Sequence, residues 1–294
     1  MTPAVEAHGL RKSYGPVLAV DDLSFEVRPG EIVGVLGPNG AGKTTALQLC
    51  LRLLHADAGE ARLFGLDPED LAARRRIGYA PDSPLFPRSL TGARIMDLHA
   101  DLLEVPRAKA AELVERFGFA EPAQRPTATY SRGQLQRLGL AQALLGEPAL
   151  LLVDEPTAGL DPAGVAFVRE LLIGLRARGG SVLLNSHLLS EVERICDRVL
   201  FMKNGRLLRT HDSRAGGRRA EIKLANASRL AARLAQKFPD SALDGPHFRI
   251  AIASEDVVPA LVRQLVEMEA EVLEVTVKGA ELEELYLQIV EGRA

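Results

Sequence analysis

The hydrophobic pattern of the chain changes period several times, and each change predicts a different element. Leu23–Val27 alternates apolar and polar residues like a half-buried strand. A helical pattern begins at Lys43 and continues to about Leu54. Strands and helices that follow one another in this way predict an α/β fold with a mostly parallel core sheet. The runs that predict core strands buried on both faces are Ile32–Leu36, Leu150–Asp154 and Ser181–Asn185.

Two further patterns add to this core. Between about Thr91 and Leu145 the pattern is nearly all helical, which predicts a helical insertion. Lys203–Arg206 places Asn-Gly between two apolar segments, which predicts a hairpin with a type I′ turn.

The composition shifts at His211–Arg219, a polar and basic stretch with glycines that we interpret as a linker. Beyond it, strand-like and helical patterns alternate and end in a helix expected over Glu281–Val290. This order predicts a small α+β domain of ferredoxin-like character. We therefore divide the chain into a first domain, residues 1–213, and a second domain, residues 214–294.

Composition excludes several classes of protein. The chain has 294 residues, of which 47% are hydrophobic, and 36 Lys and Arg against 39 Asp and Glu give a net charge of −3. This balance is typical of a folded globular protein and disfavours a chain-wide basic surface for nucleic acid, which is not an expected partner. Cys50 and Cys196 are too few for a disulfide framework. No apolar stretch reaches the ~18–20 residues of a membrane span, so we expect a soluble, cytoplasmic chain.

A glycine-rich segment that we call the phosphate loop, Gly37–Thr44, joins a predicted buried strand to a predicted helix. Its glycines let backbone N–H groups converge on phosphate oxygens, and the helix N-terminus adds its positive end. Lys43 is expected to reach the β- and γ-phosphates and Thr44 to ligate Mg²⁺. The alternative is a turn that only connects strand to helix. The residues predicted to bind nucleotide here are Gly37, Pro38, Asn39, Gly40, Ala41, Gly42, Lys43 and Thr44.

Two carboxylates end the second buried strand. Asp154 at the strand tip is placed to hold Mg²⁺ through water, and Glu155 beside it is placed to orient or deprotonate an attacking water. By itself, an aspartate at this position would more often be the N-cap of the next helix. A phosphate loop on a neighbouring strand favours the functional interpretation.

Together with the segments that follow, these motifs resemble the nucleotide-binding subunits of ATP-binding-cassette (ABC) transporters. Tyr130–Gln134, which we call the signature segment, is similar to the family signature Leu-Ser-Gly-Gly-Gln. Ala158–Asp161 is similar to the D-loop, and Asn185–His187 to the segment that carries the switch histidine. The resemblance covers about residues 4–210 and implies a P-loop cassette with an antiparallel β subdomain and a helical insertion.

The resemblance also implies roles for single residues. Tyr14 would stack on the adenine of ATP, Thr45 would complete the phosphate loop's contacts, and His187 would contact the γ-phosphate. The family sandwiches two ATP molecules in a head-to-tail dimer, so part of each site comes from the opposite subunit. Alternatives are a strand-end histidine for His187 and a surface aromatic for Tyr14. The residues expected to serve the shared nucleotide sites are Ser131, Gly133, Gln134 and Asp161.

The sequence departs from the family pattern at two functional positions. Arg132 stands where the signature has its first glycine, and Asp82 stands where the Q-loop glutamine is usual. An acidic residue at that position, together with the tail Leu282–Leu287, resembles the subgroup that energises exporters with separate membrane subunits. Asp82 is predicted to hold Mg²⁺ directly or through water, because hard cations prefer carboxylate oxygen. A turn or N-cap role after Pro81 is the alternative.

The first hypothesis that the resemblance implies is an ATPase subunit that powers a membrane transporter. It would act as a dimer on an integral membrane permease, at the inner face of the cell membrane. A soluble cassette ATPase of DNA repair or translation is the second hypothesis, although such proteins usually carry two cassettes or a long coiled coil. A regulatory module without turnover is disfavoured because Glu155 and His187 are both present. An importer subunit remains an alternative, and the transported substrate is not encoded in this chain.

Overall fold

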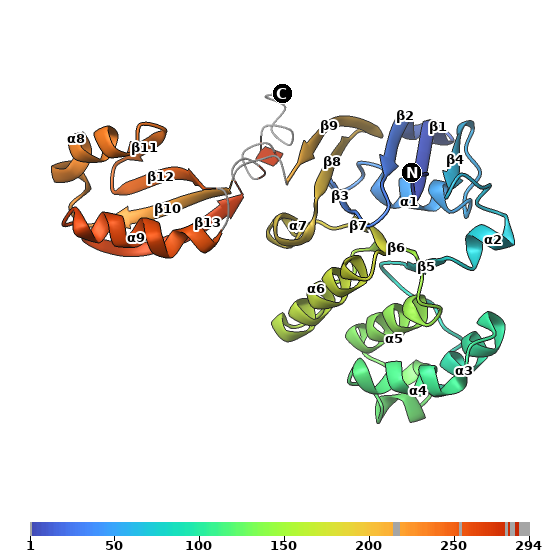
Figure 1. Ribbon diagram of the computed structural model, residues 1–294. Helices are drawn as coiled ribbons and strands as arrows, with labels where there is room; N and C mark the ends of the chain where they lie inside the picture. The colour runs from blue at the N-terminus through green and yellow to red at the C-terminus, as the bar shows by residue number, and fades with distance from the viewer. Residues whose placement is uncertain (1, 214–217, 253–254, 280–281, 283–285, 288–294) are drawn as a thin grey trace. The chain divides into compact units, whose positions relative to one another are not determined.

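The computed structural model describes residues 2–213, 218–252, 255–279, 282 and 286–287 (Figure 1). The chain divides into two compact units. The larger unit extends to Thr210, and the smaller one runs from His211 to Leu287.

The larger unit is built on a six-stranded sheet with the order β5-β6-β7-β3-β8-β9. The pairs β5–β6, β6–β7, β7–β3 and β3–β8 are parallel, which confirms the mostly parallel core. Strands β3, β6 and β7 are buried at every position and have the predicted bounds. Because the carboxyl ends of parallel strands meet at one edge, the segments after β3, β6 and β7 converge there. The strands are β3 (Ile32–Leu36), β5 (Ile77–Ala80), β6 (Leu150–Asp154), β7 (Ser181–Asn185), β8 (Arg198–Lys203) and β9 (Arg206–Asp212).

A second sheet of three antiparallel strands has the order β2-β1-β4, which confirms the antiparallel subdomain. Its inner residues, including Val5, Leu10 and Leu63, share one core cluster with Val33 of β3 and Leu47 of α1. Helix α1 therefore lies between the two sheets and follows β3 after the segment Gly37–Gly42. The elements are β1 (Val5–Tyr14), β2 (Val17–Val27), β4 (Ala58–Leu63) and α1 (Lys43–Cys50).

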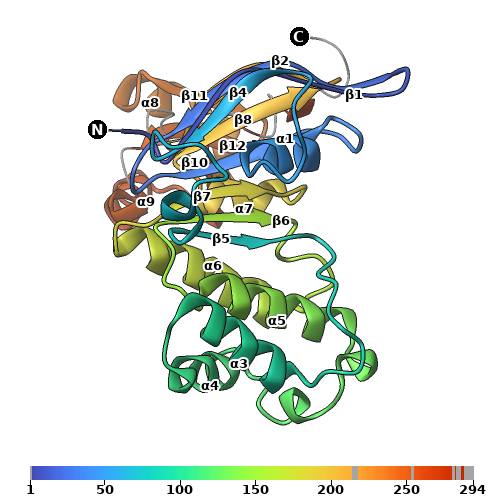
Figure 2. The ribbon, with the colours of Figure 1, turned by 90° about the vertical axis from the view of Figure 1, so that its right-hand side faces the viewer.

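Helix α1 ends four residues before the predicted Leu54, because Arg52 adopts a left-handed φ of 54° that a helix cannot continue. The predicted helical insertion is confirmed by α3, α4 and α5. Figure 2 shows α5 next to β5, with α3 and α4 on its far side. The remaining helices of this unit are α2 (Leu71–Arg74), α3 (Gly92–Leu103), α4 (Arg107–Arg116), α5 (Arg132–Leu144), α6 (Pro162–Ala177) and α7 (Leu189–Ile195).

The predicted hairpin joins β8 to β9, and Asn204 and Gly205 have φ values of 51° and 79°, as a type I′ turn requires. The linker expected over His211–Arg219 is wrong in extent. Strand β9 reaches Asp212 and β10 begins at Arg218, so both ends of the predicted linker belong to strands. Residues 214–217 lie outside the described part.

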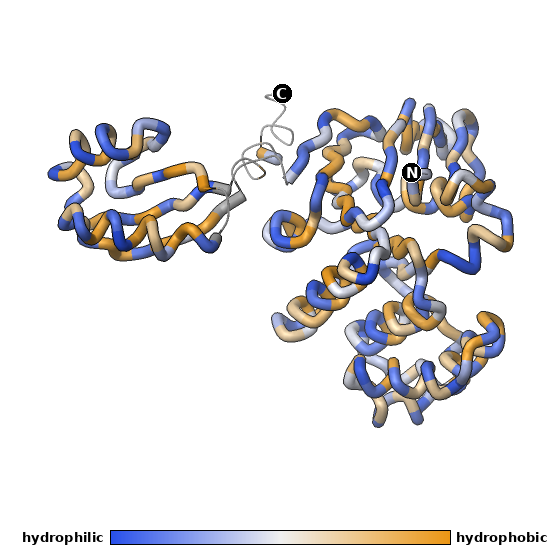
Figure 3. Tube along the Cα trace, viewed as in Figure 1, coloured by the Kyte–Doolittle hydropathy of each residue, from blue (hydrophilic) through white to orange (hydrophobic). Residues whose placement is uncertain are grey.

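The smaller unit folds as β10-α8-β11-β12-α9-β13 with the sheet order β11-β12-β10-β13, which is the ferredoxin-like topology. Strand β11 was not expected from the sequence, because it is a short edge strand of two polar and two apolar residues. The closing helix predicted over Glu281–Val290 lies almost wholly outside the described residues. Figure 3 shows hydrophobic and hydrophilic positions mixed around α6 and α9, as expected of helices that cover a core on one side. The elements are β10 (Arg218–Leu224), α8 (Ala227–Lys237), β11 (Ser241–Asp244), β12 (His247–Ile252), α9 (Val258–Glu267) and β13 (Val272–Gly279).

Among the described residues, no helix combines the length and the apolar character that a membrane span requires.

Candidate functional site

The phosphate loop leaves the carboxyl edge of β3 and enters α1, as the sequence predicts. Lys43, the first residue of α1, is only 7% exposed and turns its ammonium back into the loop. Its Nζ donates to the carbonyl oxygens of Gly37 at 2.8 Å and Pro38 at 3.2 Å. Burial lowers the pKa of Lys43, against the opposing influence of Glu155 and Asp154. The loop thus holds a positive charge at its centre, where phosphate oxygens would lie.

The conformation of the loop depends on Gly42. This residue caps α1 with a φ of 95°, and a Cβ there would lie 2.1 Å from the carbonyl oxygen of Ala19. A second tie comes from the β8–β9 turn, where the Gly205 N–H donates to the carbonyl oxygen of Ala41 at 3.0 Å. Asn39 and Gly40 are exposed at the tip of the loop, and Thr45 is half-buried on α1.

Asp154 ends β6 next to the phosphate loop and is 1% exposed. Nδ2 of Asn185 donates a hydrogen bond to its carboxylate, and the Thr44 side chain lies nearby. Burial raises the pKa of Asp154, and the nearby charge of Asp82 raises it further. Among the described residues, Asn185 Oδ1 is buried and has no hydrogen-bond partner. The structure therefore places two predicted metal ligands, Thr44 and Asp154, near each other, with the unpaired Asn185 Oδ1 close to Asp154.

Glu155 and His187 meet on the same edge of the sheet. His187 Nδ1 lies 2.6 Å from Glu155 Oε2, and the His187 backbone N–H donates to the same oxygen at 3.3 Å. Glu155 has a left-handed φ of 48°, and its N–H donates to the carbonyl oxygen of Asn185 at 2.9 Å. Strained backbone of this kind persists only where the surroundings fix it, and it is common at active sites. With Nδ1 turned to the carboxylate, the other ring nitrogen, Nε2, remains for a ligand.

The signature segment begins α5 and forms a capping box. Ser131 Oγ accepts from the Gln134 N–H at 3.2 Å, and Gln134 Oε1 accepts from the Ser131 N–H at 3.0 Å. Gly133 is half-buried near the carbonyl oxygen of Gly159. Within the described residues, no hydrogen bond or ion pair joins these residues to the phosphate loop of the same chain.

Asp161 and Tyr14 occupy the ends of other elements. Asp161 is the N-cap of α6, where its Oδ1 accepts from the Gly164 N–H at 2.9 Å and lies 3.9 Å from Arg137. Tyr14 ends β1 and is 48% exposed. Asp57 fixes the residue before it, since its Oδ2 accepts from the Ser13 N–H at 2.7 Å.

Asp82 is held by neighbours of its own. Its Oδ1 accepts from Arg132 Nη2 at 3.0 Å, and its Oδ2 accepts from Ser83 Oγ at 3.2 Å. Arg132 and Asn185 lie within motifs of the sequence, but no motif predicts a role in the site for either. The only sequence signal for Arg132 was its departure from the glycine of the family signature.

Comparison with known proteins agrees with this geometry. The family model described as ABC transporter matches residues 20–158. An uncharacterised ABC transporter ATP-binding protein of Nostoc, all4389, is 40% identical over 65% of this chain and 59% of its own length. The Nod factor export ATP-binding protein I of Ralstonia nicotianae is 37% identical over 70% of this chain and 66% of its own. The match therefore spans less than two thirds of these two relatives.

Two further comparisons cover more of the matched protein. The daunorubicin resistance ATP-binding protein DrrA3 of Streptomyces coeruleorubidus is 35% identical over 97% of this chain and 95% of its own length. A solved ATP-binding subunit of an ABC transporter has a TM-score of 0.66 and 29% identity, and the match covers 71% of this chain and 90% of that one. The chain therefore belongs to the ATP-binding proteins of ABC transporters, the ATPase subunits that power membrane transport.

Proposed function

We propose that the chain binds ATP with Mg²⁺, hydrolyses it in a head-to-tail dimer and drives an exporter through an integral membrane permease. The observation that carries the proposal is the contact of 2.6 Å between Glu155 and His187, on the same sheet edge as Asp154 and the phosphate loop. This contact supports hydrolysis rather than binding alone, because it prepares a base next to the place where the γ-phosphate would lie.

The phosphate loop supplies the grip on ATP. Backbone N–H groups of Gly40 and Gly42 and the start of α1 would bind phosphate oxygens, and Lys43 would exchange its carbonyl partners for them. Tyr14 would stack on the adenine from the exposed end of β1. The chain has only one half of each shared site, so Ser131, Gly133, Gln134 and Asp161 would act on the ATP held by a second copy.

The site suits Mg²⁺. This cation takes hydroxyl and carboxylate oxygens with several waters and phosphate oxygens, and it needs only one or two protein carboxylates. Thr44 and Asp154 provide such oxygens near each other, and the unpaired Asn185 Oδ1 can accept from a bound water. Among the described residues, no group of three or more His, Cys, Asp or Glu side chains could form a metal cage, so the phosphates would supply further ligands. Bound Mg²⁺ neutralises charge that develops on the phosphates.

Glu155 would act as the general base. A water that attacks the γ-phosphorus loses a proton to Glu155 Oε2 while the bond to the β-phosphate oxygen breaks and ADP leaves. His187 holds that carboxylate through Nδ1 and its backbone N–H, and it would offer Nε2 to the γ-phosphate. The site thus fixes the base before the nucleotide arrives.

Export is supported by the relatives and by Asp82. One relative carries export in its name and another carries drug resistance. Proteins of this family work as pairs with membrane subunits, so we place the chain at the inner face of the membrane, bound to a permease. The transported solute would be bound by that permease, and this chain would supply the force.

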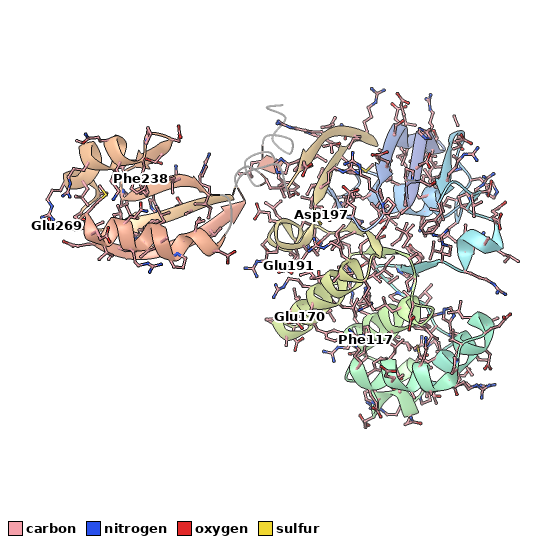
Figure 4. The ribbon with its side chains drawn as sticks, viewed as in Figure 1. Phe117, Glu170, Glu191, Asp197, Phe238 and Glu269 are labelled. Carbon is pink, nitrogen blue, oxygen red and sulfur yellow. The ribbon has the colours of Figure 1, made fainter. Side chains whose placement is uncertain are left out.

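The test replaces Glu155 by glutamine in the full chain. Glu155→Gln should keep ATP binding, lower turnover by at least ~10²-fold and accumulate an ATP-bound dimer that size-exclusion chromatography detects. Glu170→Gln, at an exposed position of α6 (Figure 4), is the matched control and should hydrolyse ATP normally. In vesicles with the permease, the wild type should move solute outward and Glu155→Gln should not. Inward movement would assign an importer, and normal hydrolysis by Glu155→Gln would remove it as the base.

A further inference from the structure

Two residues that depart from the family pattern form an ion pair with each other. Arg132 Nη2 lies 3.0 Å from Asp82 Oδ1, although 50 residues separate them in the sequence. Asp82 comes two residues after β5, and Arg132 is the first residue of α5. The pair therefore joins the segment after a core strand to the start of the helical insertion's last helix.

A cation at the start of a helix needs compensation. The first turn of a helix carries unpaired N–H groups and a partial positive charge, so an arginine there is unfavourable by itself. Ser131 and Gln134 satisfy part of this end through the capping box. Asp82 brings a negative charge to the same place, which offsets the charge of Arg132 and of the helix end.

Arg132 also borders the turn that follows the proposed base. A Cβ at Gly159 would lie 3.3 Å from Arg132 Cδ, so the aliphatic part of the arginine lies against that turn. Gly133 faces the carbonyl oxygen of the same Gly159, 3.5 Å from its own Cβ position. The start of α5 is thus packed on the segment between Glu155 and Asp161.

Asp82 also lies near Asp154, the predicted metal ligand at the end of β6. Ala80 of β5 pairs with Val153 of β6, directly before Asp154, which places Asp82 close to that carboxylate. The charge of Asp82 acts on Asp154 accordingly. Asp82 therefore acts on Asp154 through its charge and is paired with Arg132 of the signature segment.

We propose that Asp82 and Arg132 are positioning residues that fix the N-terminus of α5 against the Asp154–Glu155 edge, so that the signature segment meets the ATP of a second copy. The inference rests on the head-to-tail dimer of the proposed function. It assigns Asp82 to Arg132 rather than to Mg²⁺, because both carboxylate oxygens of Asp82 already accept hydrogen bonds from side chains.

The test compares Asp82→Asn, Arg132→Ala, their combination and the exchange Asp82→Arg with Arg132→Asp, all in full chains. ATP affinity and the Mg²⁺ concentration for half-maximal hydrolysis should stay within about twofold, because the phosphate loop is untouched. A partly exposed ion pair contributes a factor of about 1.5 to 5, and a symmetric dimer contains two, so ATP-dependent dimerisation should weaken about 2- to 25-fold. Dimerisation is measured in chains that also carry Glu155→Gln. In chains that keep Glu155, kcat should fall while KM stays unchanged.

Further comparisons separate positioning from a general structural role. The double variant should be no worse than either single variant, and the charge exchange should restore more than half of the lost dimerisation. Arg107→Ala is the matched control, since it removes another exposed ion pair, with Asp101 at 2.6 Å, from the helical insertion, and it should change neither quantity. A raised Mg²⁺ requirement for Asp82→Asn alone would make Asp82 a metal ligand and overturn the inference. Unchanged dimerisation in all variants would overturn it as well. Failure of Glu155→Gln itself to dimerise would instead refute the proposed function.

Discussion

The smaller unit has a core of its own, and replacement of Phe248 by alanine tests whether it unfolds independently. Phe248 lies on β12, is 0% exposed and belongs to a cluster that includes Ile222 and Leu265. Its ring lies 5.5 Å from that of Phe238, which is labelled in Figure 4. No residue of the larger unit belongs to this cluster as described. The replacement should therefore destabilise the smaller unit and leave the ATP site intact.

The expected magnitude follows from burial and size. Truncation of a buried phenylalanine to alanine costs about 3–5 kcal/mol. The unit spans the 77 residues from His211 to Leu287, for which a stability of about 4–12 kcal/mol is typical. The loss is thus a large share of the total, and for a domain of this size it lowers the melting temperature by about 12–40 °C.

The assay is calorimetric unfolding of the full chain with and without Mg²⁺ and ATP. Ligand binding stabilises only the unit that binds it, so the nucleotide should raise the larger unit's transition and identify it. Phe248→Ala should lower the other transition alone. Leu273→Ala, at a position of the same unit that is 62% exposed, is the control and should change stability by less than about 0.5 kcal/mol. A single transition that Phe248→Ala lowers as a whole, or a loss of ATP binding, would refute independent folding.

The remaining predictions concern the ATP site of the larger unit. Burial raises the pKa of Asp154, so its ionised form destabilises the fold at neutral pH. Asp154→Asn should therefore have a higher melting temperature than the wild type at pH 7, and the gain should shrink as the pH falls toward 3.8, the ordinary pKa of aspartate. The variant should also lose Mg²⁺-dependent hydrolysis. A lower melting temperature at pH 7 would contradict this prediction. Gly42→Ala would place a Cβ 2.1 Å from the Ala19 carbonyl oxygen and should weaken ATP binding at least ~10-fold in a titration. Gly179→Ala, with a similar φ of 86° and open space around it, should bind ATP normally, and equal losses in both variants would make strain rather than the clash responsible.

The bounds of the core strands could be predicted because a strand that is buried on both faces requires a continuous run of mostly apolar residues. Ile32–Leu36, Leu150–Asp154 and Ser181–Asn185 are apolar almost throughout, and tertiary context did not change them. Strand β5 (Ile77–Ala80) and strand β11 (Ser241–Asp244) have four residues each and lie at sheet edges. Their strand state comes from pairing with one neighbour, which no local pattern encodes.

The same distinction applies to the site. The spacing from Gly37 to Thr44 predicts the phosphate loop because one continuous segment makes all of it. The contact between Glu155 and His187 joins residues 32 apart, and it depends on the parallel register that pairs Asp154 with Asn185. Motif order placed both residues on one edge but could not show that they touch. The ion pair of Asp82 with Arg132 could not be predicted from the sequence either, because it depends on how α5 packs.

The two halves of a shared ATP site are held in different ways, and this difference bears on how hydrolysis produces movement. Backbone groups lock the phosphate loop, with Gly42 against Ala19 and the Gly205 N–H on Ala41, so it cannot shift without disturbing β2. The pair of Asp82 and Arg132, whose side chains are 42% and 61% exposed, helps to hold the first turn of α5, whereas later residues such as Leu138 and Leu140 are buried. Regions held by few buried contacts are the ones that open at low free-energy cost. Movement between ATP-bound and ATP-free states should therefore be easiest at the first turn of α5, with the phosphate loop as the fixed side, and Asp82 is paired with that turn.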